Sequence, residues 1–300
     1  FNRCFGILKK KPMWFFQKEN LAQKFAAAEA ITQGYLELKS PNELYDRLKY
    51  IDISLSDIDY YNTLFASETY VHLLAIASMN RSGFVREKAI RELGKLQNRN
   101  GIKFILLRLG DWVAAVRKAA LEAIRAFLSP DFFDIFLQNL PLVDWLLFVQ
   151  RADLLGIHNE SIDFVLSKEF TADLYQRVKK HDEKTRLIYF KYLFNKQVVD
   201  EEIVHLVLND KNYLIRAALV KQVQHLATSK RKELVSKFLQ DRAAKVRVAA
   251  LYETRAFDHE FEPTVIELTS DESASVRYLA RFLLKDRSLN LADIYRQRLL

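Results

Sequence analysis

The sequence predicts an all-α protein, a right-handed α-α superhelix of antiparallel helix pairs, that is, an α-solenoid. Two observations indicate this fold class. The 300 residues are 50% hydrophobic but include only 7 glycines and 5 prolines, too few for short strands joined by tight turns. Apolar helical segments also recur about every 31 residues. Because a helix pair of that length cannot bury both faces by itself, neighbouring pairs must stack.

An arginine after a β-branched residue marks the repeat. The motif opens five amphipathic segments, over residues 85–96, 116–127, 215–226, 246–257 and 276–284. Its arginines are Arg86, Arg117, Arg216, Arg247 and Arg277, which lie 31 residues apart at the start and 31 then 30 apart at the end. Arg151 and Arg186 fill the central gap at spacings of 34, 35 and 30. We therefore expect seven units in one register.

A second residue keeps this register, six positions before the arginine. It is always Asn or Asp in the clear copies: Asn80, Asp111, Asp210, Asp241 and Asp271. Such a residue is a natural N-cap for the following helix. We also expect the arginines to reach these carboxylates in their own or neighbouring repeats, as an Asp/Arg ladder of charge-assisted hydrogen bonds. Asp144 lies seven positions before Arg151, and Asp182 four before Arg186, so these two repeats should be irregular.

Each of these segments follows another apolar helix. The expected first helices cover residues 101–109, 131–140, 161–178, 200–208, 232–240 and 262–268. Small residues such as Ala119 and Ala120 let stacked helices approach closely. Three or four leading helices are expected between residues 26 and 78. The domain organisation is then an arm and leading helix over 1–40 and a repeat array over 41–300, clear from about residue 68 and divergent over 129–198.

With Asp in the internal turn and Val-Arg opening an Ala/Leu helix, the unit resembles the HEAT repeat, especially the short bacterial HEAT-like type of bilin (phycobilisome) lyases. The resemblance covers about residues 68–300 and is strongest at both ends. It implies a curved superhelix whose second helices line the concave face, with protein binding as the commonest use. The family also includes alkylpurine DNA glycosylases, so the motif identifies structure and not chemistry.

The N-terminal arm differs in composition from the repeats. Residues 1–24 carry six basic residues against Glu19 alone, and their aromatic residues are Phe1, Phe5, Trp14, Phe15 and Phe16. Lysines beside Trp and Phe suit the cytoplasmic headgroup region of a membrane, so residues 1–18 are a candidate peripheral membrane contact. The alternative is that Trp14 and its neighbours cap the first apolar layer. Because the chain starts at Phe1, one hypothesis is a tether to the inner face of a membrane by a preceding segment.

Charge and cysteine content favour a cytoplasmic protein without a disulfide framework. The formal net charge of +8 permits a nucleic-acid or anionic-lipid partner without requiring one. The single cysteine, Cys4, fits a reducing compartment. It is a candidate attachment point for a bilin or lipid, although a terminal cysteine without a neighbouring base is usually inert.

The sequence contains no catalytic or metal-binding motif that we can identify. No HExxH, phosphate-binding glycine loop, dinucleotide fingerprint or nucleophile elbow occurs. The histidines are scattered, and we expect surface or edge positions for all of them: His72, His158, His181, His205, His225 and His259. We therefore predict no enzyme activity, no metal and no cofactor.

Two features suggest binding sites. Trp112 and Trp145 each follow an aspartate and lie 33 residues apart, so we expect equivalent turns of adjacent repeats with the indoles side by side. Such a pair is similar to the aromatic and acidic pocket of the HEAT-like glycosylases, which trap a flipped base. The alternative is that both indoles fill gaps in divergent layers.

The second feature is a strip on the second helices, which we call the concave lane. Counted from the Val-Arg motif, its members should point away from the core: Arg91, Lys95, Arg125, Lys221, Tyr252, Arg255, Tyr278, Arg281 and Lys285. A basic and aromatic strip could hold an acidic peptide, a phosphorylated segment or a nucleic-acid backbone. Glu87 and Glu122 share this face, so a merely solvated strip is the alternative.

These observations predict a non-enzymatic repeat scaffold that binds a protein or acidic peptide through the concave lane. Long rigid surfaces built from small increments suit such recognition. Two other functions stay open. One is a DNA-binding repair protein of the HEAT-like alkylpurine DNA glycosylase type. The other is a lyase-type assembly factor, for which Cys4 would matter.

Overall fold

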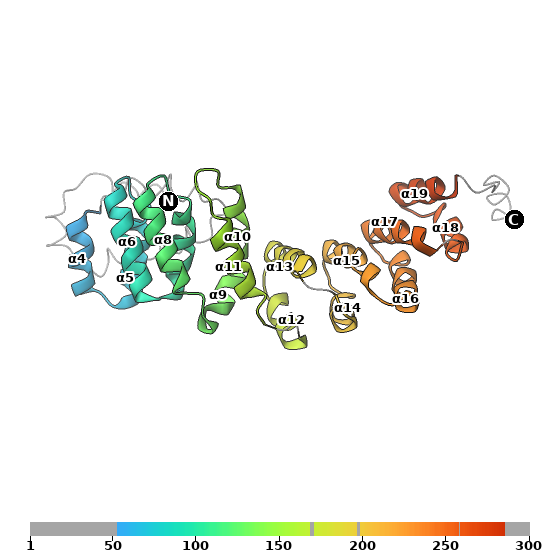
Figure 1. Ribbon diagram of the computed structural model, residues 1–300, viewed down its shortest axis with the longest axis horizontal. Helices are drawn as coiled ribbons and strands as arrows, with labels where there is room; N and C mark the ends of the chain where they lie inside the picture. The colour runs from blue at the N-terminus through green and yellow to red at the C-terminus, as the bar shows by residue number, and fades with distance from the viewer. Residues whose placement is uncertain (1–52, 169–170, 197–198, 258, 286–300) are drawn as a thin grey trace. The chain divides into compact units, whose positions relative to one another are not determined.

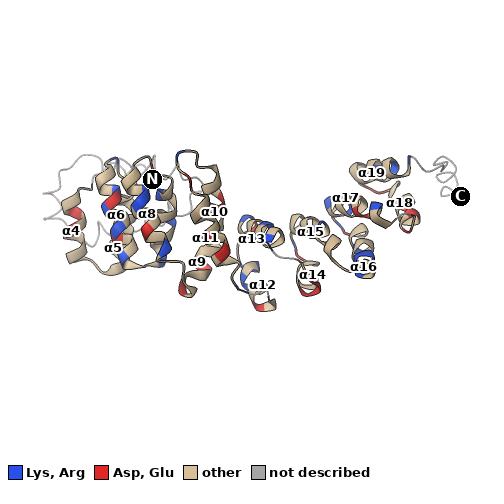
Figure 2. Cartoon of the chain, in the orientation of Figure 1, with Lys and Arg blue, Asp and Glu red and all other residues tan. Residues whose placement is uncertain are grey.

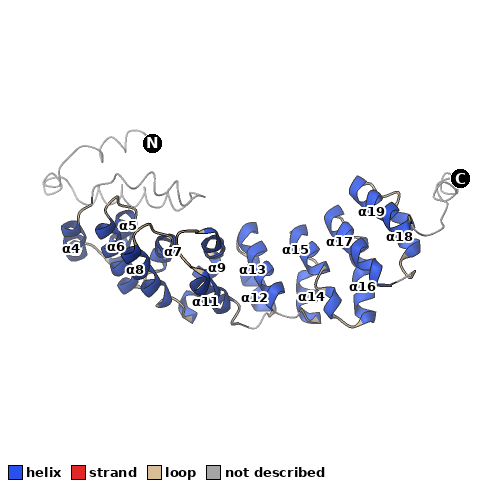
Figure 3. Ribbon diagram, turned by 45° about the horizontal axis from the view of Figure 1, so that its top comes forward, coloured by secondary structure: helices blue, strands red, loops and turns tan. Residues whose placement is uncertain are grey.

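The computed structural model describes residues 53–168, 171–196, 199–257 and 259–285 (Figure 1). All regular structure in these residues is helical, and no strand occurs among them, which confirms the predicted all-α class (Figure 3). The chain divides into two compact units, Phe1–Lys168 and Glu169–Leu300. The N-terminal arm over 1–40, including its membrane-contact candidate 1–18 and Cys4, lies outside the described residues.

The first unit contains helices of very different length. They are α4 (Leu55–Leu64), α5 (Ser67–Ala77), α6 (Gly83–Leu96), η2 (Arg99–Gly101), α7 (Ile102–Leu109), α8 (Ala114–Arg125), η3 (Pro130–Phe132), α9 (Phe133–Gln138), α10 (Leu140–Trp145), η4 (Leu146–Phe148) and α11 (Leu155–Val165). The first of these begins with a capping box, in which Ser54 and Asp57 each accept the other's backbone N–H. From residue 130 to residue 148 the chain consists only of short helical turns.

Packing in the first unit follows the helix-pair scheme. The pairs α5/α6 and α7/α8 are in contact, and the second helices α6 and α8 pack along one another. Glycine makes this approach possible, because a Cβ at Gly94 would stand only 2.8 Å from the Cβ of Ala123. Buried aliphatic side chains such as Ile90, Leu106 and Ile124 fill the layer between the helices. Leaving water stabilises each of them by about 1.5–3 kcal/mol.

The residues of the second unit that the structure describes form four successive helix pairs. They are α12 (Ala172–Lys179) with α13 (Glu183–Lys196), α14 (Glu201–Val207) with α15 (Tyr213–Val220) and η5 (Val223–His225), α16 (Thr228–Leu239) with α17 (Ala244–Glu253) and η6 (Thr254–Phe257), and α18 (Glu262–Leu268) with α19 (Ala274–Leu284). The second helices α15, α17 and α19 contact one another in that order. Figure 3 shows the two helices of each pair side by side.

Several element boundaries differ from those expected. The helix expected over 161–178 is two helices, because α11 ends at Val165 and Thr171 caps a new one by accepting the Leu174 N–H. The second helices begin two residues before the Val-Arg motif. Two of them end early and continue as a 3-10 turn, after Val220 and after Glu253.

Among the described residues, no helix combines the length and apolar character that crossing a bilayer requires.

Candidate functional site

The clearest polar feature of the second unit is a row of arginines that join successive repeats. Arg216 donates from Nε and Nη2 to the two carboxylate oxygens of Asp241, both at 2.7 Å. Its Nη1 donates to the backbone carbonyl of Asp210, in its own repeat, at 2.5 Å. One buried guanidinium therefore holds its own turn and the turn of the next repeat. Such bidentate pairs are among the stronger hydrogen bonds in proteins.

The same arrangement continues in both directions along the second unit. Arg247 donates to the carbonyl of Asp241 and to the carboxylate of Asp271, both at 2.7 Å. Before Arg216 in the chain, Arg186 pairs with the carboxylate of Asp210. Helix α13 and the three turns that follow it are thus connected through the carboxylates of Asp210, Asp241 and Asp271. This arrangement fixes the relative position of α13, α15, α17 and α19.

The described part of the first unit contains one such link. Arg86 donates from Nε and Nη2 to Asp111 at 2.8 and 2.7 Å, and from Nη1 to the carbonyl of Asn80 at 2.8 Å. Asp111 also accepts Nη1 of Arg108 at 3.0 Å. Arg117 donates to the carbonyls of Asp111 and Trp112 but forms no ion pair with a described residue. Within this unit the connection from repeat to repeat therefore ends at α8.

The expected N-cap role of these residues is wrong. The N-cap position is two residues later in each repeat, and the Asp or Asn side chain instead accepts the N–H of the N-cap residue. For example, Asp111 Oδ1 accepts the N–H of Val113, the residue at which α8 is capped, at 2.8 Å. The carboxylate therefore shapes the turn before the helix, and its second oxygen remains available for the arginine. Asn212 is a true N-cap, accepting the Leu214 N–H.

Burial and charge act in opposite directions on the ladder carboxylates. Burial raises the pKa of Asp111, but the hydrogen bond from Arg86, the charges of Arg108 and Arg86 and the bond from the Val113 N–H together outweigh it, so that the pKa lies below its usual value. Asp241 shows the same balance: its pKa is lowered because the hydrogen bond from Arg216 and other contributions outweigh burial. Both residues are therefore anions at neutral pH, as the pairing with arginine requires.

Arg151, expected in the ladder register, lies elsewhere. It occupies the turn before α11, and its guanidinium carbon lies 4.0 Å above the centroid of the Trp112 ring. Asp182 is not a ladder residue either. It caps α13 by accepting the N–H and the hydroxyl of Thr185. The seven-unit register predicted through Arg151 is thus wrong at that residue.

In the first unit, glutamates neutralise the concave lane. Arg91 pairs with Glu87 and Glu122, and Figure 2 shows basic and acidic residues together on α6 and α8. Lys95 pairs with Glu92, and Arg125 pairs bidentately with Glu160. The sequence pattern placed Glu87 and Glu122 on this face but did not indicate Glu92 or Glu160. This part of the lane is a mixed-charge surface and not a basic one.

In the second unit three cations of the lane are exposed and lack a carboxylate partner among the described residues. Lys221, Arg255 and Lys285 form no ion pair with any described residue. Tyr252 and Tyr278 are exposed to 54% and 74% on the adjacent helices α17 and α19. We call this set, together with exposed Phe282, the aromatic-basic face: Lys221, Tyr252, Arg255, Tyr278, Phe282 and Lys285.

One residue assigned to the lane lies elsewhere, and one was missed. Arg281 donates to the carbonyl of Thr269, so its head group turns toward the end of its own first helix. Phe282 is 54% exposed. It occupies the position five residues after the ladder arginine, which Lys221 and Tyr252 occupy in the two preceding repeats. Comparing that position between repeats would have found it.

The two tryptophans do not form a shared site. Trp112 is highly exposed in the turn before α8, whereas Trp145 is the last residue of α10 and half-buried. Trp145 packs beneath the turn at Gly110, where a Cβ would stand 3.2 Å from the Cη2 atom of the indole. No ring contact joins the two indoles within the described residues. The expected equivalence of the turns and the side-by-side indoles are both wrong.

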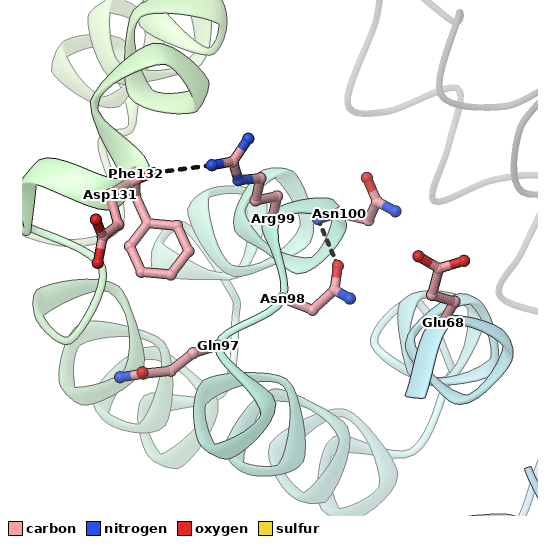
Figure 4. A pocket seen from close by; sticks show the side chains of 7 residues that line it. All are labelled: Glu68, Gln97, Asn98, Arg99, Asn100, Asp131 and Phe132. Atoms are coloured by element: carbon pink, nitrogen blue, oxygen red, sulfur yellow. Dashed lines mark hydrogen bonds between the residues drawn. The ribbon is translucent and has the colours of Figure 1, made fainter. Parts of the chain in front are cut away.

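A polar hollow of about 400 Å³ lies at the other end of α6 (Figure 4). Gln97, Asn98 and Arg99 line it, with Glu68, Asn100, Asp131 and Phe132. Asn98 accepts the N–H of Asn100, and Arg99 donates to the carbonyl of Asp131. The bond from Arg99 joins the turn between α6 and α7 to the turn between α8 and α9. The residues that line the hollow include no nucleophile with an adjacent base.

The histidines do not build a metal centre in the described part of the chain. No group of three or more His, Cys, Asp or Glu residues with ligand geometry occurs there. Contrary to the expected surface or edge positions, His72 and His158 are buried. His259 contacts the carboxylate of Glu262 at 2.9 Å on the surface.

No protein-family model matches the chain, and no curated protein matches its sequence.

Proposed function

We propose that the protein is a HEAT-like repeat scaffold, a right-handed α-solenoid, that binds a protein partner through the aromatic-basic face of its second unit. The observation that carries this proposal is the row of exposed Tyr252, Tyr278 and Phe282 beside the cations Arg255 and Lys285. Exposed aromatic residues next to basic ones are typical of binding hot spots. The HEAT-like resemblance of the repeat supports the same assignment.

The ladder supports this function by holding the face rigid. Arg216 and Arg247 fix α15, α17 and α19 through buried ion pairs, so the exposed side chains need little further ordering on binding. Preorganisation of this kind lowers the entropic cost of association. The cations without carboxylate partners favour a partner segment that is acidic. The neutralised part of the lane, on α6 and α8, offers no comparable attraction.

Affinity capture with charge-reversed full-length chains tests this proposal. The test variant is Arg255→Glu with Lys285→Glu. The matched control is Lys211→Glu with Arg242→Glu, which makes the same charge change at exposed turn positions of the same unit. We expect a protein that the wild type and the control retain and the test variant loses. Equal capture by all three chains would contradict the proposal.

The capture experiment also separates protein binding from the DNA-repair alternative. Duplex DNA held electrostatically would appear in the eluate as nucleic acid and be lost steeply with salt. The Trp112 and Trp145 side chains provide no shared pocket for a flipped base. Nucleic acid lost in the test variant, without any protein, would therefore overturn the proposed function.

A further inference from the structure

Three of the most exposed aromatic side chains in the described residues lie at the turn edge of the first unit. Phe84 is 76% exposed, Trp112 is 75% exposed and Phe148 is 71% exposed. They come from three successive turns: the start of α6, the turn before α8 and the end of η4. None of them belongs to the aromatic-basic face, and none is needed to bury the core.

Close contacts place the three turns that carry these residues next to one another. A Cβ at Gly83, beside Phe84, would stand 3.0 Å from a methyl group of Val113. On the other side of Trp112, a Cβ at Gly110 would stand 3.2 Å from Val149, the residue after Phe148. We call the resulting patch the aromatic edge: Phe84, Trp112, Val113, Phe148 and Arg151.

Repeat stacking does not explain an aromatic residue at this position. In the second unit, the residues that directly follow the ladder aspartates are Lys211, Arg242 and Glu272, all charged and exposed. Trp112 occupies the equivalent position after Asp111. Stacked repeats therefore tolerate ordinary solvated side chains here. Large aromatic side chains that are more than 70% exposed on neighbouring turns, in place of charged ones, favour an interaction site.

Arg151 gives the patch its charge. Its guanidinium carbon lies over the Trp112 ring, 4.0 Å from the centroid, and the side chain forms no ion pair with a described residue. The cation–π attraction to the indole restrains the guanidinium, and its planar set of N–H donors remains available to a carboxylate. Such a group is preorganised for a bidentate bond to a carboxylate.

We propose that the aromatic edge is a second docking site, which binds a peptide segment that carries a carboxylate between apolar side chains. The carboxylate pairs with Arg151, and the apolar side chains cover Trp112, Phe84 and Phe148. Charge complementarity defines this occupant, because an uncharged apolar segment would leave the Arg151 guanidinium buried and unpaired. The site is separate from the aromatic-basic face and does not depend on it.

Selection from a displayed library of random dodecapeptides on the full-length chain tests this site. Enriched peptides should contain Asp or Glu flanked by aliphatic or aromatic residues. A synthetic copy should bind Trp112→Ala and Arg151→Gln chains at least about tenfold more weakly than wild type, in the range of hot-spot substitutions. Tyr278→Ala, on the second unit, should bind it as wild type does.

A charge swap protects the test against misfolding of a variant. An Arg151→Glu chain should lose the peptide and regain binding when the acidic residue of the peptide is replaced by Lys. No enrichment, or binding that survives Trp112→Ala, would overturn the site. Sedimentation equilibrium tests the other occupant, a second copy of the chain. If the chain dimerises, Trp112→Ala abolishes the dimer and no peptide is enriched, the aromatic edge is a dimer contact and the proposal is overturned.

Discussion

Replacing Asp241 by alanine removes the shared carboxylate at the centre of the second unit's ladder. Asp241 accepts two bonds of 2.7 Å from Arg216 and a third, of 2.8 Å, from the Ala243 N–H. The Arg216 side chain is only 4% exposed and that of Asp241 12%. The Asp241→Ala chain therefore keeps a buried guanidinium that has lost its counterion.

The size of the effect follows from this burial. Removing one partner of a buried ion pair costs about 3–5 kcal/mol, because the remaining charge is left uncompensated. The control is Glu160→Ala, which removes the partner of Arg125 in the first unit. Its pair has the same bidentate geometry, but the two side chains are 52% and 40% exposed. An exposed pair is worth about 0–1 kcal/mol.

Urea unfolding followed by far-ultraviolet circular dichroism measures both changes, and hydrogen exchange locates them. We expect faster exchange in α15 and α17 of the Asp241→Ala chain and little change in the Glu160→Ala chain. An Arg216→Ala, Asp241→Ala double variant should be less destabilised than the sum of the single variants. Equal destabilisation by the Asp241 and Glu160 substitutions would refute the role assigned to the ladder.

Three further predictions concern acid stability and the helix contacts. Because the pKa of Asp111 is lower in the folded than in the unfolded chain, its stabilising contribution is complete above about pH 4 and is lost as the pH falls through the folded pKa. The thermal midpoint of the wild-type chain should therefore fall from neutral to acid pH, and that of Asp111→Asn should fall less. A wild-type midpoint that does not change with pH would contradict this. Gly94→Val forces apart α6 and α8 at Ala123 and should lower the free energy of unfolding, measured in urea, by about 1–3 kcal/mol. In contrast, a Cβ at Gly156 would meet nothing within 4 Å, so Gly156→Ala should raise the free energy of unfolding by about 0.5–1 kcal/mol. Gln97 has φ 45°, so Gln97→Gly should stabilise by up to about 1 kcal/mol, and a lower thermal midpoint would argue against strain at this cap.

Repeat spacing predicted the ladder at Arg86, Arg216 and Arg247, because the same two side chains recur at a fixed distance in the chain. Arg117 and Arg277 were also expected in the ladder, but they donate to carbonyls of their own turns and form no ion pair with a described residue. Arg216 and Asp241 are 25 residues apart, a separation that recurs for Arg86 and Asp111. The position of the N-cap was missed because Asp and Asn favour both caps and turns of this kind. The backbone of the structure distinguishes a cap from a turn, because it places the N-cap two residues after the Asp or Asn.

The side-chain surroundings of the lane were harder to predict. Glu160 meets Arg125 from 35 residues away, on a helix whose register is irregular. Arg281 differs from Phe282 by one position, yet one turns toward Thr269 and the other toward solvent. A one-residue step rotates a side chain by about 100° around a helix, so a face assigned by counting fails at its margins.

The division of the helix expected over 161–178 into α11 and α12 has a similar origin. The pattern of apolar residues continues through residues 161–178, and periodicity alone does not distinguish one helix from two. Thr171 marks the second start by its cap. Trp145 was expected in a turn equivalent to that of Trp112 because the two lie 33 residues apart. A fixed spacing implies equivalent positions only where the repeats have equal length.

The affinity of the captured protein for wild-type and Tyr278→Ala chains tests the central claim most directly. Tyr278 is the most exposed aromatic residue of the aromatic-basic face, and its removal leaves the ladder intact. By calorimetric titration of the full-length chains, we predict an affinity at least about tenfold lower for Tyr278→Ala, as for a hot-spot residue. Equal affinities would show that the partner binds elsewhere and would contradict the proposed function.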